Sequence, residues 1–190
     1  MITEKRTTNE TQILIQLNLY GSGTSEVDTG IGFFNHLIQT FSRFSSIDLQ
    51  MHATGDLEVD QHHLVEDCGI SLGQAIDKAL KTRENIERCG FSILPMDDSL
   101  SRAVIDFGGR PYSIFEAKFK RRFCGDFDLD LMTEFFRGLA NGSRANIHLK
   151  TEYGNNDHHI AESLFKAFGK ALKMAIQITE NGLLSTKGVI

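Results

Sequence analysis

Two short stretches of the chain repeat one arrangement of imidazole and carboxylate side chains. They read HHLVE at 62–66 and HHIAE at 158–162, and they hold four of the seven histidines. Residues i and i+4 share one face of a helix, whereas residue i+1 points about 100° away. Each stretch therefore offers a chelating pair and one spare imidazole. The pairs are His62 with Glu66 and His158 with Glu162, and the spare imidazoles are His63 and His159.

These donors favour a particular class of metal ion. A mixture of imidazole and carboxylate suits borderline ions such as Mn²⁺, Fe²⁺ or Zn²⁺ better than Ca²⁺ or Mg²⁺. One such stretch can arise by chance, but a second copy with the same internal spacing is difficult to obtain by accident. If the two copies face each other, each of two sites takes the pair from one copy and the spare imidazole from the other. We therefore predict two transition-metal sites.

The elements that must position these residues are repeated as well. A shift of 96 residues superposes the two stretches, and the match continues on both sides of them. The further matches are His52 with His148, Gly73 with Gly169, Ala75 with Ala171 and Ala79 with Ala175. Such persistence predicts a duplicated supersecondary unit. We expect two similar halves, residues 1–92 and 93–190, that share one core.

Hydrophobic periodicity predicts the elements of each half. Alternating apolar residues predict strands, and apolar residues spaced by three and four predict helices. The expected strands are 11–20, 47–53, 91–94, 99–107, 111–120 and 145–151. The expected helices are 31–44, 60–82 with Asp60 as its cap, 130–140, and 158–180 closed by Asn181 and Gly182. This pattern indicates an α+β fold in which each half is a mostly antiparallel sheet with helices packed on one face.

Complete coordination needs further ligands, and the repeat indicates where they lie. His36 precedes His62 by 26 residues, and Glu134 precedes His158 by 24 residues. Both fall on the expected helix before a histidine pair, so both are candidate ligands at matching points of the repeat. Taken alone, His36 is also consistent with a packed core residue and Glu134 with a solvated one.

Composition restricts the classes of function. The net charge of −5 argues against binding to nucleic acid or acidic membranes, but it allows a small anionic substrate held by local cations. No apolar run is long enough to span a bilayer, and the N-terminus lacks the apolar core of a signal peptide. The odd number of cysteines, without a CxxC motif, fits a reducing cytoplasm. They are Cys68, Cys89 and Cys124.

Longer segments with characteristic sequences run nearly from end to end of the chain. They are NETQI at 9–13, TGIGFFNHL at 29–37, GDLEVDQHHLVEDCGISLGQA at 55–75, PMDDSLSRAVIDFGGRPY at 95–112, EFFRGLA at 134–140, GNNDHHIAESLFKAFGKAL at 154–172 and STKGV at 185–189. Together these segments resemble one known family, the imidazoleglycerol-phosphate dehydratases of histidine biosynthesis. Paired HHxxE motifs in these surroundings are highly specific, so the resemblance implies a lyase that removes water from its substrate.

The resemblance also implies an assembly and a cofactor. Trimers of a duplicated α+β unit would form a hollow homo-oligomer of 24 subunits, with two Mn²⁺ ions per active site bound between subunits. One ion would be held by His36, His63, His158 and Glu162, and the other by His62, Glu66, Glu134 and His159. Each set joins the i,i+4 pair of one copy to the spare imidazole of the other, in agreement with the helix geometry.

The implied reaction converts imidazole glycerol phosphate into imidazole acetol phosphate. The substrate ring becomes an imidazolate, the hydroxyl on the adjacent carbon leaves, and the resulting diazafulvene loses a C–H proton to a carboxylate. The metals would act as Lewis acids and as a template, with acid–base help from a side chain. The implied catalytic residues are Glu10, for proton transfer, with His62, Glu66, His158 and Glu162. The implied substrate contacts are Glu10, His36, His62, Arg88, Arg110, Lys166, Ser185, Thr186 and Lys187.

Three positions depart from the commonest family pattern. Glu134 stands where many relatives have His, which adds negative charge. Phe44 stands where relatives often place a pocket histidine. Asn35 replaces a frequent Asp before His36, which weakens a hydrogen bond that would support the ligand.

Two other functions stay open at this point. In a binuclear hydrolase of phosphate esters, the ions would touch phosphate oxygens rather than imidazole nitrogens. A metal-storage protein would bind the ions without catalysis, but carboxylate-rich storage bundles need four long helices. The alternating strands argue against such a bundle.

Overall fold

The computed structural model describes residues 1–190, and none of its helices has the length and apolar character that a membrane span needs. The first half contains β1 (Ile2–Thr7), β2 (Thr11–Asn18), β3 (Ser25–Asp28), α1 (Gly32–Ser45), β4 (Asp48–Gly55) and α2 (His62–Leu80). The second half contains β5 (Cys89–Met96), β6 (Ser99–Asp106), β7 (Tyr112–Glu116), β8 (Phe123–Cys124), β9 (Phe127–Asp128), α3 (Leu131–Ser143), β10 (Asn146–Tyr153) and α4 (Asp157–Ala175).

The two halves share one sheet topology. Their four-stranded sheets have the orders β1-β2-β4-β3 and β5-β6-β10-β7. In each sheet two neighbouring pairs are antiparallel, and the last pair, β3 with β4 or β7 with β10, is parallel. The short hairpin of β8 and β9 belongs to the second half alone. The predicted α+β fold with duplicated, mostly antiparallel halves is therefore confirmed.

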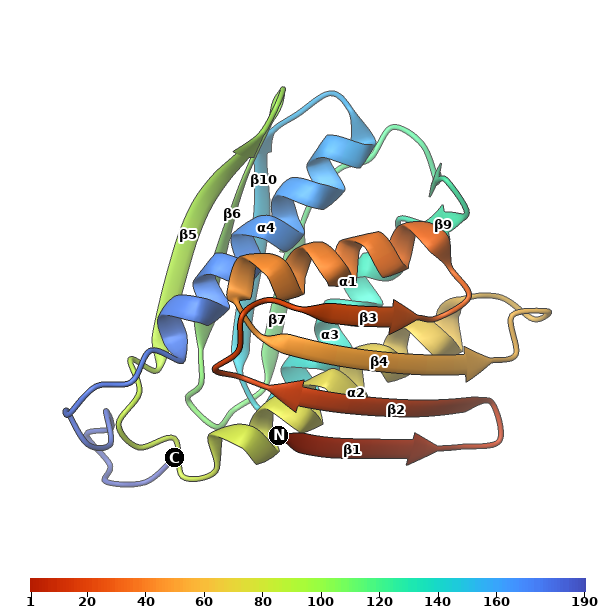
Figure 1. Ribbon diagram of the computed structural model, residues 1–190. Coiled ribbons are helices and arrows are strands. Elements are labelled where there is room, and N and C mark those ends of the chain that lie inside the picture. Colours follow the sequence, from red (N-terminus) through yellow and green to blue (C-terminus); the bar gives the residue numbers. More distant parts are fainter.

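The four helices lie between the two sheets (Figure 1). Helix α1 packs against α4, and α2 packs against α3, so each helix pair joins the two halves. At several glycines of α2 and α3, an added Cβ would collide with the backbone of the other helix. These glycines are Gly69, Gly73, Gly138 and Gly142. The buried apolar residues of both halves form one cluster, as the prediction of a shared core requires.

The predicted apolar faces are buried, with one informative exception. In β2, Ile13, Ile15 and Leu17 are buried and alternate with more exposed residues. On α1 the apolar residues Phe34, Leu37, Ile38 and Phe41 are also buried, whereas Phe33 near the N-terminus is half-buried. Phe33 lies at the end of α1 that carries His36, where the buried core ends and the candidate ligands begin.

The structure corrects several predicted boundaries. The last helix ends at Ala175 rather than near residue 180. Residues 177–179 are extended instead, because their backbone pairs with residues 85–87: Glu87 donates to Gln177, Thr179 donates to Asn85, and Ile86 bridges Ile178. The predicted strand at 111–120 is shorter, Tyr112–Glu116. The predicted division between residues 92 and 93 falls within β5, and the chain passes between the sheets in the loop at 81–88.

Candidate metal centre

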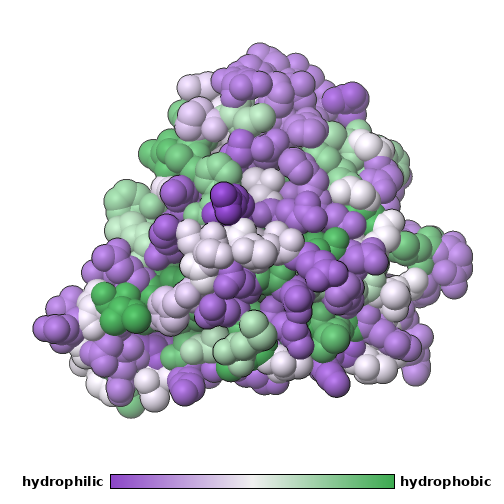
Figure 2. Space-filling view, viewed as in Figure 1, coloured by the Kyte–Doolittle hydropathy of each residue, from purple (hydrophilic) through white to green (hydrophobic).

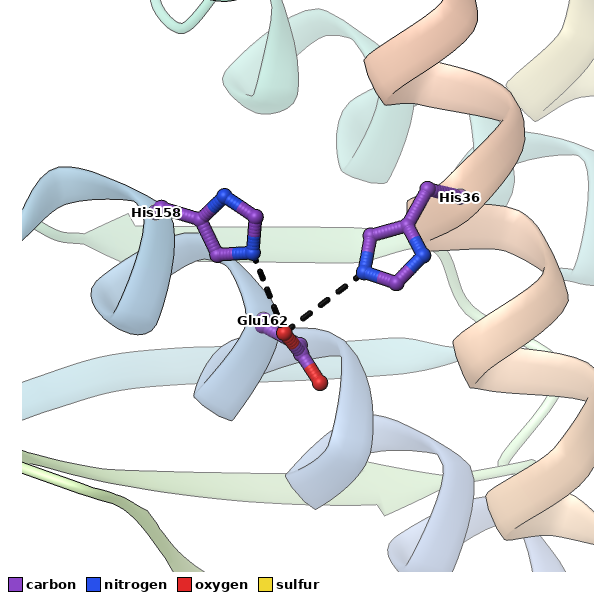
Figure 3. A group of neighbouring side chains, drawn as sticks. All are labelled: His36, His158 and Glu162. Carbon is purple, nitrogen blue, oxygen red and sulfur yellow. Dashed lines mark ion pairs between the residues drawn. The ribbon is translucent and has the colours of Figure 1, made fainter.

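Three candidate ligands meet where α1 packs against α4. His36 comes from α1, and His158 and Glu162 come from the start of α4. The Nε2 atoms of His36 and His158 lie 3.5 Å and 3.3 Å from Oε2 of Glu162, and the three ligand atoms all lie within 4.8 Å of one another. Figure 3 shows both imidazoles beside this carboxylate. We call His36, His158 and Glu162 the first ligand group.

The surroundings keep Glu162 ionised. Its side chain is only 11% exposed, and Lys166, one turn further along α4, donates to Oε1 at 2.8 Å. Burial raises the pKa of Glu162, but the hydrogen bonds and charges of Lys166 and His36 outweigh burial, so this pKa lies below its usual value. Lys166 binds one carboxylate oxygen, and the two imidazoles face the other.

An aromatic side chain supports both imidazoles of this group. The ring of Phe33 lies 4.9 Å from the ring of His158 and 6.1 Å from that of His36, centroid to centroid. The two imidazoles lie 5.8 Å apart by the same measure. Phe33 precedes His36 by three residues and so lies on the same face of α1. It therefore limits the rotation of both rings.

A second ligand group, His62, Glu66 and Glu134, lies where α2 packs against α3. Nε2 of His62 lies 3.8 Å from Oε2 of Glu66, in the i,i+4 geometry that the sequence predicts. Arg137 of α3 contacts Glu66 at 3.3 Å and also pairs with Glu134. Arg137 is not among the residues that the sequence predicts for the site, although its i+3 spacing from Glu134 is the spacing of an ion pair on a helix.

The two spare imidazoles join neither group within one chain. Nδ1 of His63 lies 3.0 Å and 3.1 Å from the two carboxylate oxygens of Asp56, and Nδ1 of His159 lies 2.5 Å from Oδ1 of Asp98. A carboxylate only accepts hydrogen bonds, so Nδ1–H donates and the neutral ring has its lone pair on Nε2. Metal-binding histidines commonly take this form when a carboxylate orients them.

The donor chemistry of the first ligand group fits a transition metal. It offers two imidazole nitrogens and one ionised carboxylate oxygen, which are three of the four ligands that the resemblance assigns to one ion. The fourth assigned ligand, His63, is held by Asp56 instead. In the same way His159, assigned to the other ion, is held by Asp98.

Comparisons with known proteins identify the family of this chain. A sequence profile for imidazoleglycerol-phosphate dehydratase matches residues 29–172. The chain belongs to the imidazoleglycerol-phosphate dehydratase family. It is 49% identical over 187 residues to the imidazoleglycerol-phosphate dehydratase of an Exiguobacterium species, with 98% of this chain and 96% of that protein covered. The Staphylococcus aureus dehydratase structure is similar with a TM-score of 0.82 and 35% identity, over 94% of this chain and 100% of that chain. A structure of the Pyrococcus furiosus enzyme in complex with (S)-C348 is similar with a TM-score of 0.82 and 37% identity, and the match covers 98% of this chain and 99% of that chain.

Membership of this family confirms the predicted class of enzyme. The chain is a dehydratase, that is, a hydro-lyase, of histidine biosynthesis. The hydrolase and storage alternatives are thereby set aside. The structure places the residues that the resemblance assigned to the substrate in two separate parts of this dehydratase.

One assigned cation lies beside the first ligand group, and the others lie at the far end of α4. Lys166 contacts Glu162. Arg88 instead donates its backbone N–H to the carbonyl of Ala175, the last residue of α4, at 2.9 Å. Ala175 follows Glu162 by thirteen residues on the same helix, which is about 20 Å along the axis. The first ligand group and Arg88 therefore lie far apart within one chain.

The other assigned residues gather around Arg88. Its guanidinium forms two hydrogen bonds with Asp106, at 2.7 Å and 3.0 Å, and also donates to the carbonyl of Leu184. The C-terminal residue Ile190 packs against Gly109, which precedes Arg110. The tail residues Ser185, Thr186 and Lys187 therefore lie at the same end of the molecule as Arg88 and Arg110.

Glu10 and two of the unusual positions have clear surroundings. Glu10 is exposed in the turn before β2, and its Oε2 lies 3.8 Å from Nδ1 of His63. Phe44 lies under Lys166, whose Nζ is 5.4 Å from the ring centroid. The side-chain oxygen of Asn35 accepts hydrogen bonds from the backbone and hydroxyl of Thr29, at 3.0 Å and 2.7 Å, and so fixes the loop before α1.

Proposed function

We propose that this chain dehydrates imidazole glycerol phosphate to imidazole acetol phosphate in an active site that two Mn²⁺ ions and several copies of the chain complete. The observation that carries the proposal is the first ligand group, in which two imidazoles and an ionised carboxylate from different halves converge. Its donor types suit Mn²⁺ among the borderline ions. The bound ions would supply Lewis acidity and a template for the substrate's imidazole ring.

The ligand sets are proposed to be completed between subunits. Each ligand group has three donors and lacks a fourth, which in the second group would be a second imidazole beside His62. In both His63 and His159 an aspartate binds Nδ1–H and orients the ring, and the lone pair on Nε2 is the donor that a metal ion would use. We propose that His63 of one copy completes the first group of another, and that His159 completes His62, Glu66 and Glu134 in the same way. Binding the ions would then stabilise the assembly, because neither chain alone holds a full set.

The distance between the two ends of α4 supports the same arrangement. One substrate molecule carries both an imidazole ring and a phosphate, and it is too short to reach from Glu162 to Arg88 of one chain. We propose that the phosphate is bound by cations from another copy, with backbone donors nearby. The residues proposed from the other copy are Arg88, Arg110, Ser185, Thr186 and Lys187, and Lys166 is proposed to contact the substrate from the chain that supplies the first ligand group. Arginine suits this task because it binds phosphate through two parallel hydrogen bonds.

An exposed apolar surface supports an oligomer. Phe91 and Ile93 of β5, Val104 of β6 and Tyr112 of β7 are 64%, 59%, 45% and 60% exposed. In Figure 2, hydrophobic residues gather at the upper left edge, where β5 lies in Figure 1. Apolar areas of this kind commonly mark protein–protein contacts. We propose that they are covered in a homo-oligomer, with 24 subunits built from trimers as the family resemblance implies.

Side chains of this protein would carry the proton transfers. Departure of hydroxide from the substrate leaves a diazafulvene, in which the neighbouring C–H is acidic. We propose that Glu10 removes this proton, because its carboxylate is exposed and lies beside His63. The resulting enol then becomes the ketone. We place the reaction in the cytoplasm, because all three cysteines are free, as expected in a reducing compartment.

Metal depletion tests the proposed cofactor. Removal of divalent ions with a chelator should abolish ketone formation and reduce the particle size, and added Mn²⁺ should restore both. Retention of full activity by a chelated, metal-free preparation would contradict the proposal. Glu10→Gln is the matched variant for the proton transfer: it should keep the metal and the particle size but lose turnover.

Mixed oligomers test the sharing of sites between subunits. His158→Ala removes a metal ligand at the start of α4, whereas Lys187→Ala removes a proposed phosphate contact in the tail, at the opposite end of the molecule. Each variant alone should be strongly impaired. Dissociating and reassociating the two together should restore activity, because some sites combine the intact ligand group of one copy with the intact tail of another. Mixed oligomers no more active than either variant would argue for sites within one chain.

A further inference from the structure

The two halves differ most in the connection between their third strand and the following helix. In the first half, three residues join β3 to α1, from Thr29 to Ile31. In the second half, fourteen residues, 117–130, join β7 to α3 and include β8 and β9. We call residues 123–128 the β8–β9 hairpin. Figure 1 shows β9 beside the start of α1. This extra segment has no counterpart in the repeat, so its role is specific to one side of the molecule.

The β8–β9 hairpin caps α1, the helix that carries His36. Helix α1 begins after Ile31, whose side chain cannot cap it. Asp126 supplies the missing acceptors: its two oxygens accept from the backbone N–H groups of Gly32 and Phe33, at 2.7 Å and 3.1 Å. Burial raises the pKa of Asp126, but the hydrogen bonds from Phe33 and Gly32 outweigh it, so this pKa is lowered. The cap of α1 therefore comes from the other half of the chain.

The hairpin geometry makes this cap possible. Gly125 and Asp126 form the two-residue turn between β8 and β9, and Gly125 has a φ of +60°. Glycine takes such a conformation at little cost, which suits a tight hairpin turn. Phe127 follows directly, is fully buried and stacks on Phe34 of α1 at 5.2 Å between centroids. The turn is thus fixed against α1 by packing as well as by hydrogen bonds.

The same segment holds the starts of the two HHxxE helices. Gln61, next to His62, donates to the backbone carbonyl of Asp126 at 2.6 Å and accepts from the N–H of Asp128 at 3.1 Å. Asp157, next to His158, is buried and accepts from the backbone N–H groups of Lys120 and Arg121, at 2.9 Å and 3.0 Å. Residues 120–128 therefore connect the N-termini of α1, α2 and α4, each of which carries candidate ligands.

Asp126 has the most direct connection to the first ligand group. It binds the N–H of Phe33, and the Phe33 ring packs on both His158 and His36. His36 follows Gly32 by one helical turn. We propose that Asp126 is a positioning residue: by fixing the first turn of α1 it places His36 and Phe33 so that the first ligand group converges, and it thereby sets the affinity of that group for a divalent metal. This inference rests on the proposed metal function.

Mn²⁺ binding to the metal-free, full-length protein tests the proposal by calorimetry. Asp126→Ala should weaken binding by roughly tenfold or more, the usual effect of losing a residue that orients a ligand. Asp126→Asn keeps a capping oxygen and should bind within about threefold of the natural protein. If Asp126→Ala does not assemble, Gln61→Ala carries the test, and it should weaken binding several-fold, because it separates the hairpin from α2.

Asp48→Ala is the matched control. Asp48 also accepts from two backbone N–H groups, those of Ser22 and Thr24, but it lies at the start of β4, away from the ligand groups. This variant should lower thermal stability and leave the Mn²⁺ affinity unchanged. If Asp126→Ala binds Mn²⁺ as tightly as the natural protein and only loses stability, as Asp48→Ala does, the positioning role is wrong. The proposed function is not affected by that result. Absence of Mn²⁺ binding by the natural protein would overturn the proposed function as well.

Discussion

The first and second ligand groups occupy equivalent places in a duplicated topology, but different cations lie beside them. In the first group, Lys166 binds one oxygen of Glu162, and two imidazoles approach the other. In the second group, Arg137 contacts the carboxylates of both Glu66 and Glu134. Only the first group brings its three ligand atoms within 4.8 Å of one another.

This difference shows what duplication does and does not fix. It repeats the backbone positions from which ligands project, because both helix pairs join one helix from each half. It does not repeat the side chains that neutralise the carboxylates. The spare imidazoles show the same effect: His63 is held by Asp56, directly after β4, and His159 by Asp98, in the turn between β5 and β6. Asp56 and Asp98 have unrelated places in the two halves, although Glu10, which lies 3.8 Å from Nδ1 of His63, directly precedes β2 just as Asp98 directly precedes β6.

The largest expected effect comes from removing an imidazole from either group. His158→Ala removes a ligand of the first group, and His62→Ala removes a ligand of the second. Each variant should bind about one metal ion per chain instead of two, and its turnover should fall by roughly 100-fold or more. The reason is that both ions are proposed to act on one substrate ring. Metal analysis and a ketone assay measure the two quantities. Full activity in either variant would show that its group is not part of the site.

A smaller effect should distinguish the roles of the two cationic side chains, Arg137 and Lys166. Arg137→Gln removes the charge that competes with a metal ion for Glu66 and Glu134, so the second group should bind Mn²⁺ several-fold more tightly. The gain should be modest because Arg137 is half exposed and solvent screens its charge. Lys166→Gln in the first group is the comparison, and it should lower activity by weakening substrate contact. A loss of metal in Arg137→Gln would mean that Arg137 organises the second group.

The smallest effect concerns the two spare imidazoles in the metal-free protein. The hydrogen bond from His159, with those from the backbone of Asn155 and Asn156, lowers the pKa of Asp98 to about 2. Asp98 therefore contributes stability above the ordinary pKa of an aspartate, and that contribution is lost as the pH falls through about 2. The hydrogen bond to Asp56 raises the pKa of His63. That contribution is complete below the ordinary pKa of histidine and is lost as the pH rises through the raised value.

Denaturation of Asp98→Asn and His63→Gln over a range of pH should show these opposite slopes. The destabilisation in Asp98→Asn should be present at neutral pH and shrink in acid. The destabilisation in His63→Gln should be greatest in mild acid and shrink above neutral pH. Parallel pH profiles of the two variants would contradict the assignment of donor and acceptor in these pairs.

Much of the fold followed from local sequence patterns, and the misses have physical causes. The apolar periodicities of α1, α2 and β2 were clear because these elements bury one face. The strands β1 and β3 were missed because they are short or largely polar and depend on neighbours for their hydrogen bonds. The end of α4 was misplaced because residues 177–179 pair with residues 85–87 instead of continuing the helix.

The candidate site likewise has features that the sequence predicts and features that it does not. The i,i+4 pairs were predictable because helix geometry alone places them on one face. Asp56, Asp98 and Arg137 were not singled out, since a carboxylate or guanidinium in a sequence gives no sign of which ring or carboxylate it will meet. The complete ligand sets, with His63 and His159 in place, remain a prediction for the assembled protein.

The sequence by itself determined the donor types, their helical spacing, the duplication and the family, because these depend on residue identity and on the fixed period of a helix. Only the tertiary structure decided that α1 packs against α4, that a hairpin from the second half caps α1, and that Arg88 lies about 20 Å from the first ligand group. Those features depend on packing between segments distant in the chain, where no local rule specifies which surfaces meet.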